Sequence, residues 1–404
     1  MNRPTVLYIS YDGLLEPLGR SQVLAYAKKL SPDFRMVLLT FEKSRDLKDS
    51  DRVARTRNEV TDWGIFWVPL AYHKRPRLFA TGFDIAHGMA MALLLAVRHG
   101  ANIVHSRSYV AALIGLGVKF ATRIPFIFDM RGFWVDEAVE KGMWRRKSGW
   151  YRLGKFLERQ YLLKANAVVS LTQSAVDEMG RWEFLRNRNI NFRVITTCCD
   201  LDQFSVGTQA LPASRRNFVL GYVGNIGIWY RFDLVLTCFK YVLEQLPDAK
   251  LLVINRDQQS VIWESVDSAG IPRNLVEVKA VSHENMAAEI QKMDASAFFI
   301  KPSFAKLASA PTKLGELLAC GVPCLTSRGI GDMDNQIENG KSGVLIDFDQ
   351  MDQPKALGDA IYRLVEIANS SQTKANCRAS AQRHFSLIEG AKQYRRLYFG
   401  LLNN

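Results

Sequence analysis

Residues 301–323 read KPSFAKLASAPTKLGELLACGVP and contain the signals that define one βα unit. The apolar runs on either side, 296–300 and 322–327, are short and rich in β-branched or aromatic residues, which predicts strands. Pro311 is typical of the first turn of a helix, Gly321 of the residue after its last turn, and Pro323 prevents the helix from continuing. The stretch therefore predicts a strand, a loop, a short helix and a second strand.

The same alternation continues along the chain in both directions. In the second half the strand-like runs are 218–223, 250–255, 276–280, 296–300, 322–327 and 343–346. In the first half they are 5–11, 35–40, 64–69, 101–105, 126–129, 167–172 and 192–196. Helical patterns such as 20–30 lie between them. Strands that alternate with helices predict parallel sheets covered on both faces.

The chain length favours two domains, because 404 residues exceed what one hydrophobic core usually serves. The polar stretch 200–217 contains Gly207 and Pro212 and predicts a linker. We therefore expect an α/β protein with two doubly wound, Rossmann-like domains that face each other across a cleft. Their expected bounds are 1–205 and 206–375, with a C-terminal helical segment at 376–404.

Charge is unevenly distributed along the chain. Residues 1–200 carry 31 Lys and Arg against 19 Asp and Glu, whereas residues 201–404 carry 22 against 21. A basic first half indicates a polyanionic partner, with nucleic acid, an anionic membrane or a phosphorylated substrate as candidates.

The longest nearly uncharged apolar stretch, 89–97, is about half of the roughly 20 residues of a spanning helix, so we expect no transmembrane helix. The six cysteines lack paired spacing, which predicts free thiols and no zinc site.

Glycines mark the turn after the first strand of the second half, GYVGNIGIWYR at 221–231. Gly224 and Gly227 lie between that strand and a helix, where backbone N–H groups approach a phosphate and the helix dipole favours an anion. The alternative is that they only permit a tight turn. A dinucleotide-dependent dehydrogenase would have an acidic residue at the end of the next strand, but Asn255 stands there, which weakens that class.

The helix predicted at 311–320 presents a second set of polar residues. Its first turn carries Thr312 and Lys313, and Glu316 lies one turn further on the same face. A diphosphate fits the free amides and Lys313, and the Glu316 carboxylate suits the hydroxyls of a ribose. The alternative is a surface helix with a solvated Lys and Glu.

The run 301–323 and the sequence GIGDMDNQIENGKSGVL at 329–345 resemble the donor-binding domain of glycosyltransferase family 4, whose fold is GT-B. Shorter motifs agree in the same order: Thr172-Gln-Ser-Ala175, Cys199-Asp-Leu-Asp-Gln-Phe204, Tyr222-Val-Gly-Asn225 and Val281-Ser-His-Glu284. The resemblance implies that the second domain binds a nucleotide diphosphate sugar and the first binds the acceptor. It implies transfer with retention and without a metal or other cofactor, and a C-terminal helix that returns to the first domain.

The resemblance also assigns individual residues. Glu316 matches the second Glu of the family's paired-glutamate motif, which contacts ribose, whereas Ala308 stands at the position of the first. Asn225 and Tyr230 align with the usual cations that grip the diphosphate. Lys306 and Lys313 are then expected to act catalytically by supplying the charge, as in members with a Pro-Thr-Lys motif. The expected donor-binding residues are Gly224, Asn225, Gly227, Arg231, Ser309, Thr312 and Glu316.

Two segments of the first domain match the family's acceptor side. Asp129 and Arg131 end a predicted strand as an acidic-x-Arg variant, in which Arg131 stabilises negative charge and Asp129 orients it, touches the reacting sugar or acts as a base. The alternative is a buried Asp–Arg pair that only holds a loop. Gly19 and Arg20 occupy the position of the family's glycine loop near the β-phosphate.

The segment 141–164 carries eight Lys or Arg and one acidic residue. At helical spacing Trp150, Leu153, Leu157 and Tyr161 share one face, which is expected to pack on the domain. Arg152, Lys155 and Arg159 share the opposite face, which suits anionic lipid headgroups. A solvated basic face is the alternative, and nucleic acid is not expected because no binding motif accompanies the charge.

These observations predict a metal-independent glycosyltransferase that acts on a lipid-linked or glycan acceptor. We expect it in the cytoplasm, peripheral on the inner face of the cell membrane. Asp332 and Asp334 are expected to cap a helix, and among the histidines only His105, at a strand end, is of interest. The competing hypothesis is a noncatalytic glycosyltransferase-like membrane scaffold, motivated by Ala308 and the displaced basic residues.

Overall fold

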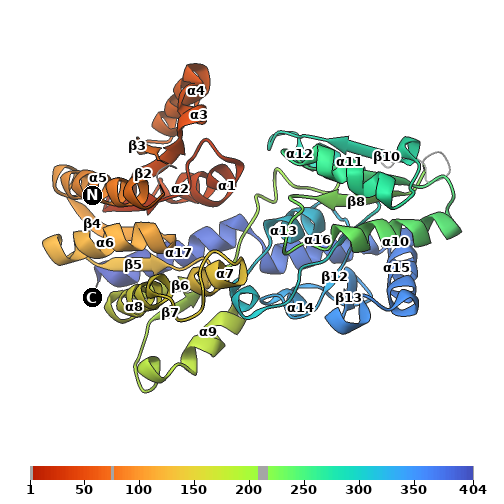
Figure 1. The fold of residues 1–404 in the computed structure, drawn as a ribbon. Coiled ribbons are helices and arrows are strands. Elements are labelled where there is room, and N and C mark those ends of the chain that lie inside the picture. The colour runs from red at the N-terminus through yellow and green to blue at the C-terminus, as the bar shows by residue number, and fades with distance from the viewer. Residues whose placement is uncertain (1–2, 74–76, 208–216, 404) are drawn as a thin grey trace. The chain divides into compact units, whose positions relative to one another are not determined.

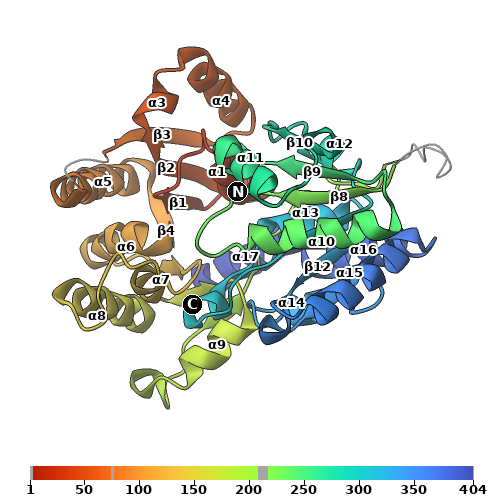
Figure 2. The ribbon, with the colours of Figure 1, turned by 45° about the vertical axis from the view of Figure 1, so that its right-hand side comes forward.

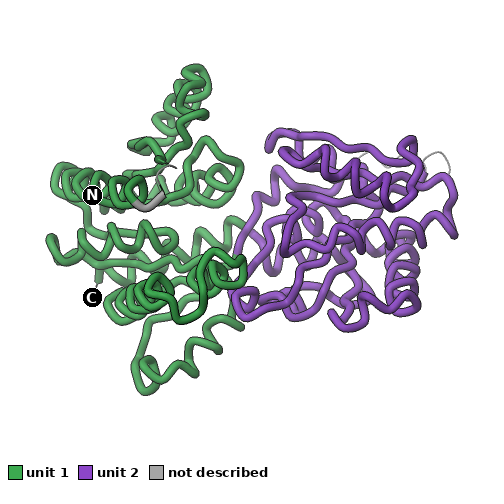
Figure 3. The backbone as a smooth tube through the Cα atoms, viewed as in Figure 1, with its two compact units in different colours: residues 1–196, 387–404 green, residues 197–386 purple. Residues whose placement is uncertain are grey.

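The computed structural model describes residues 3–73, 77–207 and 217–403, which form two compact units (Figure 3). Unit 1 comprises residues 1–196 and 387–404, and unit 2 comprises residues 197–386. Of the expected linker, residues 208–216 lie outside the described part of the chain. Residues 200–207 belong to unit 2, because the Arg378 guanidinium donates hydrogen bonds to the backbone carbonyls of Leu201 and Phe204, at 2.8 and 2.6 Å.

Unit 1 is built on a parallel sheet whose described strands are ordered β3-β2-β1-β4-β5-β6-β7 (Figure 1). The strands are β1 (Thr5–Ser10), β2 (Arg35–Lys43), β3 (Phe66–Tyr72), β4 (Ala101–Arg107), β5 (Phe126–Asp129), β6 (Ala167–Ser170) and β7 (Phe192–Val194). The central strands β1, β5 and β6 are buried along their whole length, which explains their uninterrupted apolar sequences.

Helices cover both faces of this sheet. They are α1 (Pro17–Gly19), α2 (Ala25–Leu30), α3 (Ser44–Leu47), α4 (Ser50–Asp62), α5 (Arg77–His99), α6 (Ser108–Thr122), α7 (Trp134–Glu140), α8 (Gly149–Lys164), α9 (Gln173–Gly180) and α17 (Leu387–Leu402). Helix α6 packs between α5 and α8, whereas α17 packs against α2 (Figure 1). The helix predicted at 20–30 begins as a π-helix, Arg20–Leu24, and continues as α2.

Unit 2 contains a second parallel sheet with its described strands in the order β10-β9-β8-β11-β12-β13. The strands are β8 (Val219–Val223), β9 (Lys250–Ile254), β10 (Val276–Lys279), β11 (Ala295–Phe298), β12 (Cys324–Ser327) and β13 (Gly343–Ile346). The helices are α10 (Phe232–Gln245), α11 (Gln259–Ser268), α12 (Met286–Ile290), α13 (Thr312–Ala319), α14 (Met333–Gln336), α15 (Pro354–Asn369) and α16 (Thr373–His384). Helix α10 packs beside α15, and α13 packs beside α16 (Figure 2).

The C-terminal residues divide between the two units. Helix α16 belongs to unit 2, whereas α17 belongs to unit 1, so the expected segment 376–404 contains a boundary at 386/387. Tyr394 and Tyr398 of α17 are buried, and their hydroxyls contact Asp129 and His105 at 3.0 and 2.6 Å. The last helix is therefore a structural part of unit 1, as the predicted fold class requires.

Helix α5 is unusually apolar on its outer side. Over residues 79–99 it has the length and composition of a membrane span, with one third of its most apolar window buried. This helix is longer than the apolar stretch 89–97, on which the expectation of no transmembrane helix was based. The stretch ends at the first polar residue, whereas the apolar window of the helix includes isolated polar residues. The helix packs against α6 and β1, while Phe79 and Val97 are 82% and 76% exposed. It is thus a layer of the unit whose outward face is apolar.

Candidate functional site

The predicted donor residues lie in two loops of unit 2 that leave neighbouring strands. Strand β8 pairs with β9 on one side and with β11 on the other, and β11 continues to β12. The strands that follow β8 in the chain are therefore added on one side of the sheet, and the strands that follow β11 are added on the other side. In doubly wound sheets ligands bind at such a switch point, beyond the carboxyl ends of the strands.

The loop after β8 is held in a defined conformation by two amide side chains. Asn255 donates from Nδ2 to the Gly224 carbonyl at 2.9 Å and accepts the backbone N–H of Gln258 at 2.7 Å. The Gln258 side chain in turn accepts the Ile226 N–H and donates to the Ile226 carbonyl, at 2.9 and 2.6 Å. Asn255, which stands where a dehydrogenase would have an acid, therefore serves to shape this loop.

Gly224 is required by the conformation of that loop. Its φ of +110° lies in a region that side chains rarely adopt, and a Cβ there would be 2.9 Å from the Nζ of Lys313. Gly227 differs, because nothing lies within 4 Å of the position of its Cβ. The first glycine thus allows the backbone to approach Lys313 closely, whereas the second is not sterically required.

Lys313 is buried at the start of α13, with 8% of its surface exposed. The rings of Tyr230, Tyr222 and Phe298 surround its ammonium at 4.2, 4.8 and 5.3 Å. Among the described residues no hydrogen-bond partner is present for Nζ. Burial lowers the pKa of Lys313 to about 7, although the nearby Glu316 acts in the opposite direction. A buried ammonium without an acceptor is costly unless an anion joins it.

Glu316 is buried one turn further along α13, with 9% of its surface exposed. Burial raises its pKa to about 7, against the lowering effect of Lys313. Its charge also raises the pKa values of Cys199 and Cys320, in addition to the larger effect of burial on these thiols. Ala308, at the position of the family's other Glu, is buried and offers no carboxylate.

Lys306, Ser309 and Thr312 lie at the end of the second loop and the start of α13. Lys306 is buried, and its ammonium lies 4.3 Å from the centre of the Trp229 ring. The backbone N–H of Ser309 donates to the Lys306 carbonyl at 3.2 Å. Thr312 is the first residue of α13, and Pro311 precedes it as the N-cap rather than within the first turn as expected. Because proline offers no side-chain oxygen, the first amides of α13 have no side-chain cap.

Asn225 and Arg231 are placed differently from each other. Asn225 is exposed, and its carbonyl accepts the Tyr222 hydroxyl at 2.7 Å. The Arg231 guanidinium pairs with Asp233 at 2.7 Å and with Asp352 at 2.8 Å, and these two hydrogen bonds raise its pKa. Two carboxylates therefore surround Arg231, which does not present a free charge to the loop.

In unit 1 Asp129 and Arg131 form a buried network with the last helix. The Asp129 carboxylate accepts the Tyr394 hydroxyl at 3.0 Å, and the His105 ring and the Arg131 guanidinium lie 3.4 and 3.6 Å away. Burial raises the pKa of Asp129, but the charge of Arg131 and the contact with His105 outweigh it and lower the pKa to about 2. Burial lowers the pKa of His105. Sequence reasoning missed Tyr394, whose only signal is its i, i+4 spacing with Tyr398.

Residues 208–384 match the family model of glycosyl transferases group 1, and residues 20–194 match that of the glycosyl transferase 4-like domain. The protein is a glycosyltransferase. No curated protein matches the chain by sequence.

Solved structures share the GT-B fold of this glycosyltransferase. Sucrose-phosphate synthase from Thermosynechococcus elongatus is 16% identical with a TM-score of 0.73, over 99% of this chain and 100% of that one. A glycosyltransferase from Rickettsia africae is 14% identical with a TM-score of 0.72, over 100% of both chains. Anabaena HepE in complex with UDP is 14% identical with a TM-score of 0.70, over 98% of this chain and 100% of that one. At these identities the likeness concerns the fold.

The glycine loop of the glycosyltransferase is tightly packed. A Cβ on Gly19 would lie 1.8 Å from the Gly13 carbonyl oxygen, so only glycine fits. The buried Glu42 carboxylate accepts the Leu14 N–H at 2.7 Å and thereby holds the same loop. Arg20 pairs with Glu59 at 2.9 Å, which directs its charge to α4.

Helix α8 of the glycosyltransferase is oriented differently from the prediction. Trp150 and Leu153 are 50% and 45% exposed, so the expected packing of this face is wrong for both, although Tyr161 is buried as expected. Lys155 pairs with the buried carboxylates of Asp136, at 3.0 Å, and Glu158. A buried carboxylate is costly unless a cation pairs with it. Lys155 therefore pairs with these carboxylates and does not belong to the predicted basic face. Arg152 and Arg159 are exposed.

Two further features are separate from these loops. Asp334 accepts the Gly329 N–H at 3.2 Å, and within the described residues no group of three or more His, Cys, Asp or Glu is placed to hold a metal.

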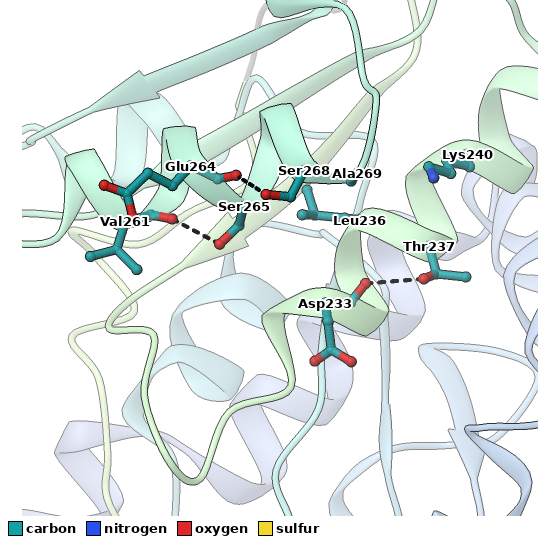
Figure 4. Close-up of a pocket in the computed structure, with 9 residues that line it drawn as sticks. All are labelled: Asp233, Leu236, Thr237, Lys240, Val261, Glu264, Ser265, Ser268 and Ala269. Carbon is teal, nitrogen blue, oxygen red and sulfur yellow. Dashed lines mark hydrogen bonds between the residues drawn. The ribbon is translucent and has the colours of Figure 1, made fainter.

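A groove of about 560 Å³ lies between α10 and α11 (Figure 4). Its hydroxyls at Thr237, Ser265 and Ser268 bond to backbone carbonyls of their own helices, and it contains none of the predicted site residues.

Proposed function

We propose that this glycosyltransferase moves a sugar from a nucleotide diphosphate to a hydroxyl of a lipid-linked or glycan acceptor, with the donor in unit 2 and the acceptor in unit 1. The observation that carries the donor assignment is the ammonium of Lys313, buried among three rings without a hydrogen-bond partner among the described residues. A diphosphate at the start of α13 supplies the missing acceptors and benefits from the positive end of the helix dipole.

The nucleotide assignment rests on two supports. Glu316 lies one turn after Lys313, at the spacing that suits a carboxylate accepting hydrogen bonds from ribose hydroxyls. Anabaena HepE, which shares the fold, has been solved with UDP and with UDP-glucose. We therefore take UDP as the first nucleotide to test.

The proposed chemistry retains the anomeric configuration and needs neither a metal nor a protein nucleophile. Departure of the diphosphate builds negative charge, which Lys313, Lys306 and the first amides of α13 stabilise because they are already in place. Asp129 is ionised, buried and already bonded to Tyr394. We assign it the orientation of Arg131 rather than the role of a base.

The test compares wild type with Glu316→Gln, using UDP and 2′-deoxy-UDP. The substitution is expected to weaken UDP binding about tenfold, since each hydrogen bond to a charged group contributes roughly 1.5–3 kcal/mol. It should have little effect on the deoxy nucleotide, which lacks one partner hydroxyl. Absence of UDP binding, or equal UDP binding by both proteins, rejects the assignment. Binding of a UDP-sugar without hydrolysis or transfer favours the scaffold alternative.

We further propose that the protein is cytoplasmic and docks on the inner face of the cell membrane through α5, α6 and α8. These helices expose large apolar side chains on one layer: Phe79, Phe83, Leu94, Val97, Phe120, Trp150, Leu153 and Phe156. Exposed Arg152 and Arg159 adjoin them on α8. Apolar side chains beside cations suit the boundary of an anionic bilayer.

Vesicle sedimentation tests this docking. Charge reversal at Arg152 and Arg159 is expected to weaken binding to anionic vesicles, and Trp150→Ser with Phe156→Ser to weaken it further. Reversal at Lys155 is unsuitable because it breaks a buried ion pair. Equal binding to neutral and anionic vesicles, or unchanged binding by all variants, contradicts the proposal.

A further inference from the structure

A histidine–aspartate pair, His73 and Asp84, lies at the carboxyl edge of the sheet in unit 1. His73 is the first residue after β3, and its Nδ1 lies 2.6 Å from Oδ1 of Asp84 in α5. The other carboxylate oxygen accepts the His73 backbone N–H at 3.1 Å and the Tyr11 hydroxyl at 3.0 Å. Tyr11 is the first residue after β1, so the cluster joins two strand ends at the same edge as Asp129 and Arg131.

The contacts determine how the His73 ring presents itself. Asp84 is buried, with 1% of its side chain exposed, and a carboxylate offers only acceptors. The Nδ1 atom therefore carries a hydrogen in this contact, and the neutral tautomer that the contact selects has its lone pair on Nε2. The His73 side chain is 43% exposed, and no described residue forms a hydrogen bond with Nε2. The pair thus presents one oriented acceptor towards solvent.

Aromatic rings accompany both residues that contact Asp84. Phe83 lies edge-on to the His73 ring at 5.3 Å, and Tyr72 lies edge-on to Tyr11 at 5.4 Å. Phe83 is 57% exposed, and the still more exposed Phe79 belongs to the same first turns of α5. A polar atom beside exposed rings matches a molecule that carries both hydroxyls and apolar surface.

We propose that His73 binds the acceptor substrate: its Nε2 accepts a hydrogen bond from an acceptor hydroxyl, and the neighbouring rings receive the apolar part of the same molecule. Asp84 is a positioning residue that sets the tautomer and orientation of His73. The inference rests on the proposed function, because it names the acceptor subsite of unit 1, and it requires no proton transfer. The chemical class is an amphiphilic glycoside or another polyhydroxylated lipid.

The experiment uses the full chain and n-octyl β-D-glucopyranoside below its critical micelle concentration, with binding read from the imidazole NMR signal of His73 and from calorimetry. An octyl sulfobetaine serves as the ligand control, since it has the same chain without sugar hydroxyls. His73→Asn keeps a donor at the Nδ1 position for Asp84 but removes Nε2, whereas His73→Gln places an amide near the Nε2 position. His87→Asn is the control, because His87 is an exposed histidine of α5, the helix that carries Asp84.

The glucoside is expected to shift the His73 signal, and His73→Asn to weaken its binding about fivefold, the equivalent of one hydrogen bond of about 1 kcal/mol. His73→Gln should retain most of the affinity, and His87→Asn all of it. A purely structural role of His73 predicts the reverse order of the Asn and Gln variants. That order, absence of glucoside binding by wild type, or an equal His73 shift with the sulfobetaine overturns the proposal. UDP binding, measured on every variant, tests the donor function independently.

Discussion

Proton-linked binding of UDP is the sharpest consequence of the Lys313 environment. In the free protein, burial lowers the pKa of Lys313 to about 7, so the side chain is mostly neutral at alkaline pH. A bound diphosphate favours the ammonium and raises the pKa again. The contribution of Lys313 to the affinity for UDP should therefore be largest below about pH 7 and fall as the pH rises.

The magnitude follows from the size of the pKa change. If the pKa in the complex returns towards the ordinary value of about 10.4, the affinity falls about tenfold between pH 8 and pH 9, or ~1.4 kcal/mol. In the same range binding takes up close to one proton. Glu316 contributes little there, because its pKa of about 7 means that it has already lost its proton.

Calorimetry of UDP binding in buffers with different ionisation enthalpies measures this proton uptake directly. The control is Lys313→Met, which keeps the length of the side chain and removes its charge. The variant is expected to bind UDP weakly, without proton uptake and with an affinity that does not depend on pH between 8 and 9. A wild-type protein that takes up no proton at pH 8, or a Lys313→Met protein that takes up as many as wild type, refutes this reasoning.

Three further outcomes are expected. Gly224→Ala should reduce UDP affinity about tenfold in a binding titration, because a φ of +110° strains any residue with a side chain and the new Cβ, 2.9 Å from Nζ of Lys313, displaces the ammonium. Gly227→Ala, with open space around it, should bind like wild type. Lys313→Met should raise the melting temperature of the nucleotide-free protein at pH 6. Because the pKa of Lys313 is lowered in the folded protein, folding disfavours its protonated form. This loss of folding stability is fully present below about pH 7 and disappears as the pH rises towards about 10.4. Asp129→Asn should lower the free energy of unfolding by about 3–5 kcal/mol, because it leaves the Arg131 charge buried without a carboxylate. Since the Asp129 pKa is lowered to about 2, wild type should lose about 2.5 kcal/mol of stability as the pH falls from about 4 to below 2, and the variant should lack that step in acid denaturation.

The order and type of the elements were largely predictable from the sequence. The runs predicted at 126–129 and 343–346 coincide with β5 and β13, and Gly321 adopts the positive φ of +81° expected after a helix. These are local properties: side-chain periodicity, β-branching and glycine freedom act within a few residues of the chain. The same locality made Glu316 and Lys313 recognisable, because both lie on one turn of one helix.

The partners of charged and titratable side chains were decided by the tertiary structure. Arg231 pairs with Asp352, 121 positions away, and the acidity of Asp129 depends partly on the fold that brings His105 beside it. Helical spacing identified a basic face on α8 but did not show that buried Asp136 would turn Lys155 inward. The hydrogen bond between His73 and Asp84 was also not predictable, because their separation of 11 positions in the chain does not indicate a contact. Burial and charge pairing depend on what the chain brings together in space, whereas the local pattern determines only which helix or strand carries each residue.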